Sequence, residues 1–429
     1  MPSLFKKGVV TSISSYATMG FGVVQTMILS RGLGPEQVGE LSLIRQIALF
    51  GAQIGSFGVP MAIVYFLNRL KMDKSMVYNT SFWTIQLLSI ISSLVIFVFL
   101  RYSSFLGNYE LWTYLAIISF IFFSNSRSLI QSLNVASQNV KKMSIVEILP
   151  MAISVLFLGL CYSFDVLDLK YALLITVVLW PLIGLVNAYM INVNQARVGL
   201  TFNFKYAIQS LRYGSVINLS DFLIIFNGSI TLFVLQYYVK DFVSVGYMSR
   251  AITLTTLINT AFISFLRILY SHWSGLTGDE LKRSVEKILN ILIYVSLLAT
   301  VLILVCSKWM IIFLFGHEFL PAKALVDVLI FGASFYLLSK AILKLFISDG
   351  KGTYNLICLA IGASSNFLLS MVLIPKYNVL GAAYAQLISG ILLALSTTIL
   401  ARRKYGISLS KVFLPQKFLF KFLKNPKNE

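Results

Sequence analysis

Long apolar stretches alternate with short polar segments along almost the whole chain. Most of these stretches reach about 20 residues, the length that an α-helix needs to cross the hydrocarbon core of a bilayer. They lack the alternating ten-residue pattern of membrane β-strands. The pattern predicts about twelve membrane-spanning helices, at residues 9–30, 38–67, 77–100, 111–135, 145–164, 171–193, 209–237, 244–271, 285–307, 322–348, 354–374 and 378–401.

The composition supports the same fold class. Of the 429 residues, 58% are hydrophobic and 12% are charged, whereas a soluble domain carries about 25% charged residues. The connections between the predicted spans are short and leave no room for a separate extramembrane domain. We therefore expect an all-α integral membrane protein in which any chemistry takes place inside the helix bundle.

The basic residues are distributed unevenly between the two sides of the membrane. Lys and Arg together number 35, against 16 Asp and Glu, which gives a net charge of +19. If the N-terminus is cytoplasmic, 22 of the 35 lie in inner segments and the tail, and seven lie in outer loops. This excess predicts that both termini are cytoplasmic. Basic loops of this kind contact anionic lipid headgroups, so we expect membrane lipids and no nucleic acid as partners.

A short motif recurs at the outer ends of two predicted spans. Gly34-Pro-Glu-Gln-Val-Gly39 opens the second span, and Val239-Lys-Asp-Phe-Val-Ser-Val-Gly246 opens the eighth. The similar segment Tyr377-Asn-Val-Leu-Gly381 opens the twelfth. Because the first two motifs are six spans apart, they predict a parallel repeat of six helices. The expected parts are an N-terminal lobe, a C-terminal lobe and a basic cytoplasmic tail, at residues 1–200, 201–401 and 402–429.

Six basic residues lie inside predicted spans, where a charge at the centre of the bilayer costs about 2.5–3.5 kcal/mol. Such residues usually face a bundle interior or a water-filled cavity. They therefore indicate a cationic interior, and a cationic interior suggests an anionic passenger. The six residues are Arg45, Arg127, Arg250, Arg267, Lys340 and Lys344.

Four of these bases are candidates for the lining of a substrate cavity. Arg127 lies deep in the fourth span, and Arg45 and Arg250 occupy similar places in the second and eighth spans, which suggests a shared rim. Lys340 precedes Lys344 by one helical turn on the same face. The alternative for Arg127 is a structural ion pair or hydrogen bond, and the alternative for the rim arginines is snorkelling or pairing with nearby acids. The other two bases lie near inner span ends and are expected to snorkel to the interface.

Asp221, about halfway along the seventh span, is the candidate for coupling to a proton or sodium ion, with a structural partner as its alternative. No metal-ligand cluster and no phosphate-binding glycine loop competes. We therefore expect no enzyme, no metal site and no cofactor other than the coupling ion. Several amides could bind sugar hydroxyls or hydrogen-bond helices together. They are Gln25, Gln53, Asn218, Asn227, Asn259 and Asn366.

Three parts of the chain resemble hallmarks of a known family. They are Lys6-Lys-Gly-Val-Val with Thr26–Gly39, Phe315–Leu325, and Pro375–Ala385. Here the chain resembles bacterial polysaccharide and O-antigen flippases of the Wzx type, in the multidrug/oligosaccharidyl-lipid/polysaccharide (MOP) exporter superfamily. The resemblance covers nearly the whole chain. It implies a MATE-like fold with two six-helix lobes around a central cavity.

The resemblance also implies a function. Undecaprenyl-diphosphate-linked oligosaccharide, such as an O-antigen or capsule repeat unit, would cross from the inner to the outer leaflet of the bacterial inner membrane by ion-coupled alternating access. The implied partners are this anionic lipid-linked oligosaccharide, membrane lipids and the polysaccharide polymerase machinery. Two alternatives remain. A multidrug exporter of the same superfamily favours an acidic cavity for cationic drugs, and a membrane polysaccharide polymerase or ligase needs large outer loops.

Overall fold

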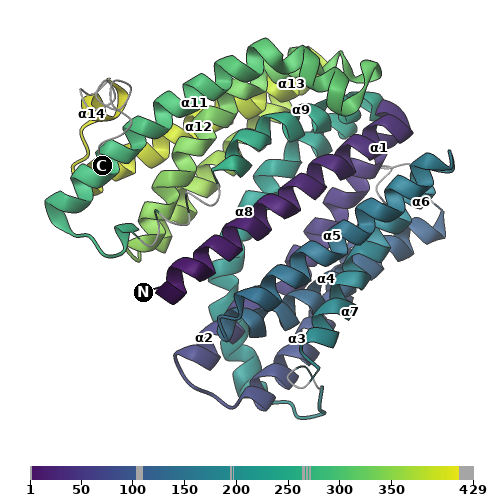
Figure 1. The fold of residues 1–429 in the computed structure, drawn as a ribbon, viewed down its shortest axis with the longest axis vertical. Helices are drawn as coiled ribbons and strands as arrows, with labels where there is room; N and C mark the ends of the chain where they lie inside the picture. The colour runs from purple at the N-terminus through teal and green to yellow at the C-terminus, as the bar shows by residue number, and fades with distance from the viewer. Residues whose placement is uncertain are drawn as a thin grey trace. The chain divides into compact units, whose positions relative to one another are not determined.

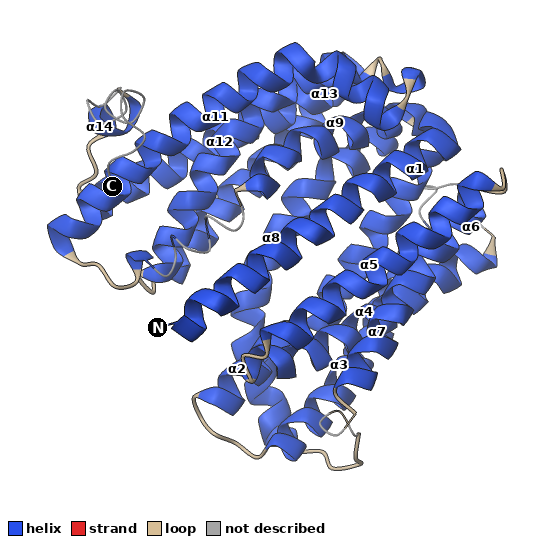
Figure 2. Ribbon diagram, in the orientation of Figure 1, coloured by secondary structure: helices blue, strands red, loops and turns tan. Residues whose placement is uncertain are grey.

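The protein is described by a computed structural model that covers residues 2–102, 110–193, 196, 198–262, 266, 269 and 272–414. Every regular element in these residues is a helix, as Figure 1 and Figure 2 show. The predicted all-α fold class is therefore confirmed.

The first half of the chain forms eight helical elements. Two of them begin at side-chain caps: the Asn139 side chain accepts a hydrogen bond from the Lys142 N–H at 3.2 Å, and Asp168 accepts one from the Tyr171 N–H at 2.8 Å. Such caps satisfy backbone donors that the first helical turn leaves free. The elements are α1 (Pro2–Ser56), α2 (Val59–Asn68), α3 (Lys74–Tyr102), α4 (Leu111–Ala136), α5 (Val140–Ser163), α6 (Leu169–Leu173), the π-helical turn η1 (Leu174–Leu179) and α7 (Trp180–Ile191).

The described part of the second half contains seven further helical elements. Its last long helix ends at Gly406, whose φ of 63° is the left-handed conformation typical of a C-terminal cap. The elements are α8 (Phe204–Val239), α9 (Phe242–Ala261), α11 (Gly278–Phe315), the 3₁₀ turn η2 (His317–Phe319), α12 (Ala322–Ser348), α13 (Gly352–Tyr405) and α14 (Leu409–Phe413).

Two of these helices each contain two predicted spans. Helix α1 breaks at Gly34 (φ 71°, ψ 176°), directly before Pro35, and α13 breaks at Asn378 (φ 50°, ψ −130°). Nine helices in the described part of the chain are long and apolar enough to cross a membrane. The two breaks divide two of these nine, and α9 covers most of the eighth predicted span, which accounts for the twelve predicted from the sequence.

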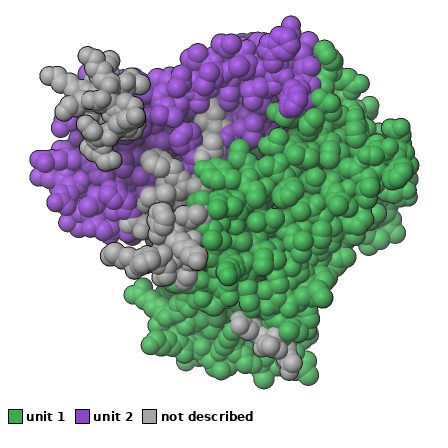
Figure 3. Space-filling model, in the orientation of Figure 1, with its two compact units in different colours: residues 1–229, 240–246, 314–318 green, residues 230–239, 247–313, 319–429 purple. Residues whose placement is uncertain are grey.

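The chain divides into two compact units, coloured separately in Figure 3. The boundary falls inside α8, after Ser229, and not between residues 200 and 201. The division into two six-helix lobes stays a prediction. The compact units are defined by packing contacts, whereas the lobes were inferred from the repeat in the sequence. Unit 1 comprises Met1–Ser229, Lys240–Gly246 and Leu314–Glu318, and unit 2 comprises Ile230–Val239, Tyr247–Phe313 and Phe319–Glu429.

Unit 1 packs around α1 and α4. Helix α1 contacts α3, α4 and α5, and α4 also contacts α2 and α7. Small residues bring these helices close together, and the Ser92 hydroxyl donates to the Gly51 carbonyl at 2.6 Å. A neighbouring bond runs from the Asn125 amide to the Ser89 hydroxyl at 2.9 Å. Small side chains and interhelical hydrogen bonds hold helices together where lipid provides no hydrophobic drive for their association.

In unit 2, α12 packs along α13. A Cβ added to Gly390 would lie 3.2 Å from the Gly332 carbonyl oxygen, so the two backbones pass close together. Large apolar side chains are exposed on other helices of both units, as expected of surfaces that contact lipid. They include Leu87, Ile90, Leu94, Val95 and Phe99 of α3, and Leu297, Leu298, Val301, Leu302 and Val305 of α11.

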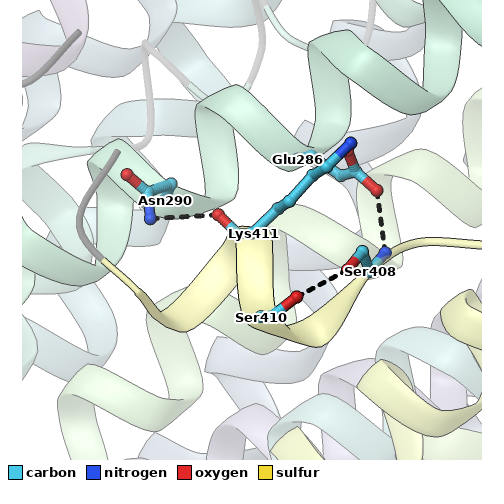
Figure 4. A network of polar contacts seen from close by, with 5 residues as sticks. All are labelled: Glu286, Asn290, Ser408, Ser410 and Lys411. Carbon is cyan, nitrogen blue, oxygen red and sulfur yellow. Dashed lines mark hydrogen bonds and ion pairs between the residues drawn. The ribbon is translucent and has the colours of Figure 1, made fainter. Parts of the chain in front are cut away.

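After α13, the segment 406–414 returns against α11, and we call this segment the C-terminal strap. The Asn290 amide nitrogen lies 3.2, 2.9 and 2.9 Å from the carbonyl oxygens of Lys411, Val412 and Leu414. Glu286 accepts a hydrogen bond from the Ser408 N–H at 2.7 Å, and its carboxylate lies 3.6 Å from the Lys411 ammonium (Figure 4). Both anchoring side chains on α11 are buried. The strap is therefore fixed in unit 2 by buried polar groups.

Candidate functional site

The two glycine motifs that suggested a repeat contact each other in unit 1. A Cβ on Gly39 would collide with the Phe242 carbonyl oxygen, and one on Gly246 would collide with the Pro35 carbonyl oxygen. Only glycine at both positions permits this approach of the two backbones. The similar motifs at the starts of the second and eighth spans thus form one structural junction.

Arg45 and Arg250 follow this junction along their helices. Arg45 lies six residues after Gly39 on α1 and is half-buried, and Arg250 lies four residues after Gly246 on α9 and is 7% exposed. At 1.5 Å per residue, the two positions lie about 9 and 6 Å from the glycine contact. Their shared rim stays a prediction, because the two side chains belong to different compact units.

Arg127 is held between α4 and α7 in unit 1. Its guanidinium carbon lies 4.8 Å from the centroid of the Trp180 ring, and that ring stacks on Phe120 at 6.2 Å. The aliphatic part of the arginine packs against Gly184, where a Cβ would come within 2.5 Å of Cδ. The carboxylate of Glu147 on α5 interacts electrostatically with the guanidinium. Arg127 therefore has structural contacts with an aromatic ring and a glycine, and its role in a cavity stays a prediction.

The remaining candidates are more scattered. The Lys340 ammonium lies 4.7 Å from the Tyr336 ring centroid, one turn earlier on α12, and Lys344 is exposed one turn later. Asp221 lies on an exposed position of α8 in unit 1. Arg267 lies outside the described residues. The assignment of these residues to a cavity or to ion coupling stays a prediction.

Most of the candidate amides bond helices or segments together. In unit 1, the Gln53 amide donates to Asn218 at 2.6 Å and the Gln25 amide donates to Ser154 at 3.0 Å. In unit 2, Asn366 accepts a hydrogen bond from Thr231 at 3.1 Å. These bonds favour the helix-packing alternative over direct sugar binding for the residues concerned.

A further group, which the sequence had not singled out, lies where the end of α2 meets the first turns of α8. The Tyr65 and Tyr213 rings stack with centroids 4.2 Å apart and planes at 21°, and the Arg69 guanidinium carbon lies 5.9 Å from the Tyr65 centroid. An open depression of about 440 Å³ lies beside them, lined by Gln209, Arg212, Tyr213 and Ile217 of α8. We call Tyr65, Arg69, Gln209, Arg212 and Tyr213 the aromatic–basic cluster.

This group was missed because its two arginines were counted only as topology signals. The relevant signal was the spacing of bases and aromatics, Tyr65 four residues before Arg69 and Arg212 directly before Tyr213. Groups of three or more His, Cys, Asp or Glu that could hold a metal ion are absent from the described residues. The chemistry that these residues offer is recognition of anions and of sugar rings.

Comparisons with known proteins agree with the fold. A family model described as polysaccharide biosynthesis protein matches residues 28–324. A search of curated proteins finds no match. Among solved structures, lipid II flippase MurJ in an inward closed conformation is similar over 98% of this chain and 94% of its own, with 14% identity and a TM-score of 0.75. An inward-facing MATE-family multidrug transporter of the MOP superfamily is similar over 93% and 98%, with 12% identity and a TM-score of 0.70.

The MATE multidrug transporter DinF-BH is similar over 96% of both chains, with 16% identity and a TM-score of 0.63. The matched structures are transporters, and this chain shares their fold. The resemblance found in the sequence is confirmed for family and fold. The chain belongs to the polysaccharide biosynthesis protein family and is a multi-pass membrane protein with the fold of MOP-superfamily transporters.

Proposed function

We propose that this protein is a flippase that moves a lipid-linked anionic oligosaccharide from the inner to the outer leaflet of the bacterial inner membrane, with both termini cytoplasmic. The observation that carries the proposal is the set of basic residues inside the spans of a chain from a polysaccharide biosynthesis family. A lipid II flippase shares the fold and supports the proposal. The sugar repeat unit would be an O-antigen, capsule or related unit.

In the proposed mechanism, two six-helix lobes alternate between inward and outward openings around the passenger. Arg45, Arg127, Arg250 and Lys340 would line the path and attract the diphosphate, for which guanidinium groups offer bidentate hydrogen bonds. The contact of Arg127 with Trp180 supports this role, because an aromatic face attracts the cation and leaves its N–H donors for phosphate oxygens. The polyprenyl tail would stay in the bilayer while the hydrophilic headgroup crosses.

Asp221 is the proposed coupling residue. A carboxylate within a spanning helix can bind a proton or sodium ion, and its charge state then differs between the two openings. Its exposed position on α8 is compatible with ion access. An Asp221→Asn variant would keep the shape of the side chain and lose the charge, so we expect it to abolish acceleration of transport by an ion gradient.

A multidrug exporter is the competing function, since MATE transporters share the fold. The family match and the excess of bases over deep acids in the spans favour an anionic passenger over cationic drugs. A transport measurement separates the two functions.

The test is translocation of a fluorescent undecaprenyl-diphosphate-linked oligosaccharide in proteoliposomes, followed by the access of a membrane-impermeant quencher. We expect Arg45→Ala and Arg250→Ala to lower the initial rate at least tenfold, because each removes charge-assisted contacts of about 1.5–3 kcal/mol. Lys344→Ala, an exposed base near the inner end of its span, is the matched control and should keep most of the rate. Transport of a cationic dye without movement of the lipid diphosphate would overturn the proposal.

A further inference from the structure

The aromatic–basic cluster is positioned by a close contact between two helices of unit 1. Gly58, with φ of 75°, begins α2, and a Cβ added to it would collide with the Gly214 carbonyl oxygen on α8. This contact sets the end of α2 beside the first turns of α8. Buried Phe66 and Tyr206 then meet edge to face at 5.1 Å and support the stacked tyrosines from below. The cluster therefore rests on a closely packed base.

The two helix segments of the cluster also share one predicted side of the membrane. The basic-residue distribution predicts that the second span ends in the cytoplasm at about residue 67 and that the seventh begins there at about residue 209. The stacking of Tyr65 on Tyr213 brings these two predicted inner ends together. A lipid-linked oligosaccharide that enters from the inner leaflet would meet this end of the unit first.

The side chains around the depression have complementary chemistry. Gln209, Arg212 and Tyr213 occupy positions i, i+3 and i+4 of one face of α8, so an amide, a guanidinium and an aromatic ring are neighbours there. Arginine binds phosphate oxygens bidentately, the amide can exchange hydrogen bonds with sugar hydroxyls, and the apolar face of a sugar ring packs on an aromatic ring. The volume of about 440 Å³ lies within the range of small-molecule sites, about 300–1,000 Å³.

The alternative that these arginines serve only as solvated topology signals does not account for the arrangement. Arg69 is exposed, but its guanidinium lies over the Tyr65 ring, which stacks on Tyr213. Arg212 lines a depression instead of standing on a convex surface. One arginine thus lies over the aromatic stack and a second lines the depression beside it, which is large enough for a sugar phosphate.

We propose that the aromatic–basic cluster is a docking site for the saccharide–phosphate headgroup of the lipid-linked substrate. The site rests on the proposed flippase function and adds a step to it: the headgroup binds at the inner end of unit 1 before it reaches the arginines inside the spans. The occupant is a headgroup that carries both a sugar and a phosphate, since Gln209 and Tyr213 suit the first and Arg212 suits the second.

The docking step predicts a separation between two kinetic constants. Removal of a docking contact raises the substrate concentration that gives half-maximal transport and leaves the maximal rate nearly unchanged. Removal of an arginine inside a span lowers the maximal rate. We expect Arg212→Ala to raise the half-saturating concentration about tenfold, because hydrogen bonds to charged groups contribute about 1.5–3 kcal/mol. Tyr213→Ala should also raise it, because this change removes the ring on which the sugar packs.

The measurement uses the full-length protein in proteoliposomes with a fluorescent short-chain polyprenyl-diphosphate disaccharide as the probe. Tyr213→Phe keeps the ring and should bind as the wild type does, which separates stacking from the hydroxyl. Lys141→Ala, an exposed base on α5 of the same unit outside the depression, is the matched control. If Tyr213→Ala fails to fold, Gln209→Ala and Arg212→Ala at exposed positions of α8 still test the site.

The outcomes separate this proposal from the proposed function. Absence of transport by the wild-type protein contradicts the flippase function itself. Wild-type transport with an unchanged half-saturating concentration in Arg212→Ala and Gln209→Ala contradicts only the docking site. As a second arm, free disaccharide diphosphate should compete with the probe in the wild type about tenfold more strongly than in Arg212→Ala. Equal competition in both proteins would overturn the assignment.

Discussion

The C-terminal strap in unit 2 and the aromatic–basic cluster in unit 1 are both places where one segment packs against a helix. The two regions use polar groups differently. In the strap, Asn290 and Glu286 are buried and directed at backbone groups of residues 408–414. In the cluster, Arg212 and Gln209 are exposed and line an open depression. Buried polar groups that are paired with backbone stabilise one conformation. Exposed charges beside an aromatic ring remain available to a ligand.

The largest expected effect concerns the strap. Replacement of Asn290 by leucine keeps the approximate size and removes the donor for three carbonyl oxygens. A buried acceptor without a partner costs about 1–3 kcal/mol, and α14, with five residues, is too short to persist alone. We expect protease cleavage within residues 406–414 to become about 100-fold faster, which corresponds to about 3 kcal/mol. Limited proteolysis of purified protein measures this rate.

The control for the strap is Ser410→Ala. Among the described residues its hydroxyl is hydrogen-bonded to that of Ser408 on the exposed surface of the strap, so cleavage should change little. If Asn290→Leu were as resistant as the wild type, the strap would be held by its apolar contacts, chiefly buried Ile407 and Val412, and not by Asn290.

The second-largest effect is expected at the contact between α2 and α8 that supports the cluster. In Gly214→Ala the added Cβ would lie 2.8 Å from the Gly58 carbonyl carbon and 2.8 Å from the Phe57 carbonyl oxygen, closer than real contacts allow. Helix α8 must then move away from α2, although alanine itself favours a helix by about 1 kcal/mol over glycine. We expect headgroup binding about tenfold weaker, because separation of the helices unstacks Tyr65 from Tyr213.

A matched control lies on the same helix. Gly228 of α8 has nothing within 4 Å of an added Cβ, so Gly228→Ala should keep headgroup binding and raise the thermal stability slightly. A Gly214→Ala variant that binds as well as Gly228→Ala would show that the cluster does not depend on the close approach of α2 and α8. Equilibrium binding of the soluble disaccharide diphosphate compares the two variants directly.

The sequence alone predicted the fold class and most helices, because hydrophobic runs and glycine or proline breaks are local signals. The tenth predicted span, 322–348, has the bounds of α12, and the break at Gly34 separates the first two spans as expected. The π-helical turn η1 was not predicted, since one extra residue in a helical turn leaves the hydrophobic run unchanged. Local periodicity therefore determines where helices are, but not their finer geometry.

The candidate sites were less predictable, because they depend on contacts between residues distant in sequence. Arg127 was singled out in the sequence as a basic residue inside a span, but its contact with Trp180 becomes visible only when α4 packs on α7. Similarly, Arg69 and Arg212 resemble other basic residues near span ends in the sequence. Only the contact between Gly58 and Gly214 in the structure shows that their helices meet. A single sequence carries no signal for either pairing.

A smaller effect is expected from Glu286→Gln. The neutral side chain still accepts a hydrogen bond from the Ser408 N–H but no longer attracts Lys411, whose side chain is 61% exposed and therefore screened by water. We expect the rate of strap cleavage to rise only about fivefold, because the change weakens one hydrogen bond to a charged acceptor and removes a weak ion pair. Lys411→Met isolates the ion pair and should have a smaller effect than Glu286→Gln. An equal effect of both changes would place the stabilisation in the ion pair instead of the backbone bond.

The smallest expected effect distinguishes the two regions without a mutation. When the salt concentration rises from 0.1 M to 1 M, the Debye length falls from about 10 Å to about 3 Å, and exposed charges are screened far more than buried ones. Headgroup binding at Arg212 should therefore weaken about threefold, whereas strap cleavage should stay constant because Asn290 is neutral and Glu286 is buried. Binding and cleavage measured on the same preparation provide the comparison. The opposite result would be faster strap cleavage at high salt with unchanged headgroup binding. It would contradict the assignment of stability to the strap in unit 2 and of headgroup recognition to the cluster in unit 1.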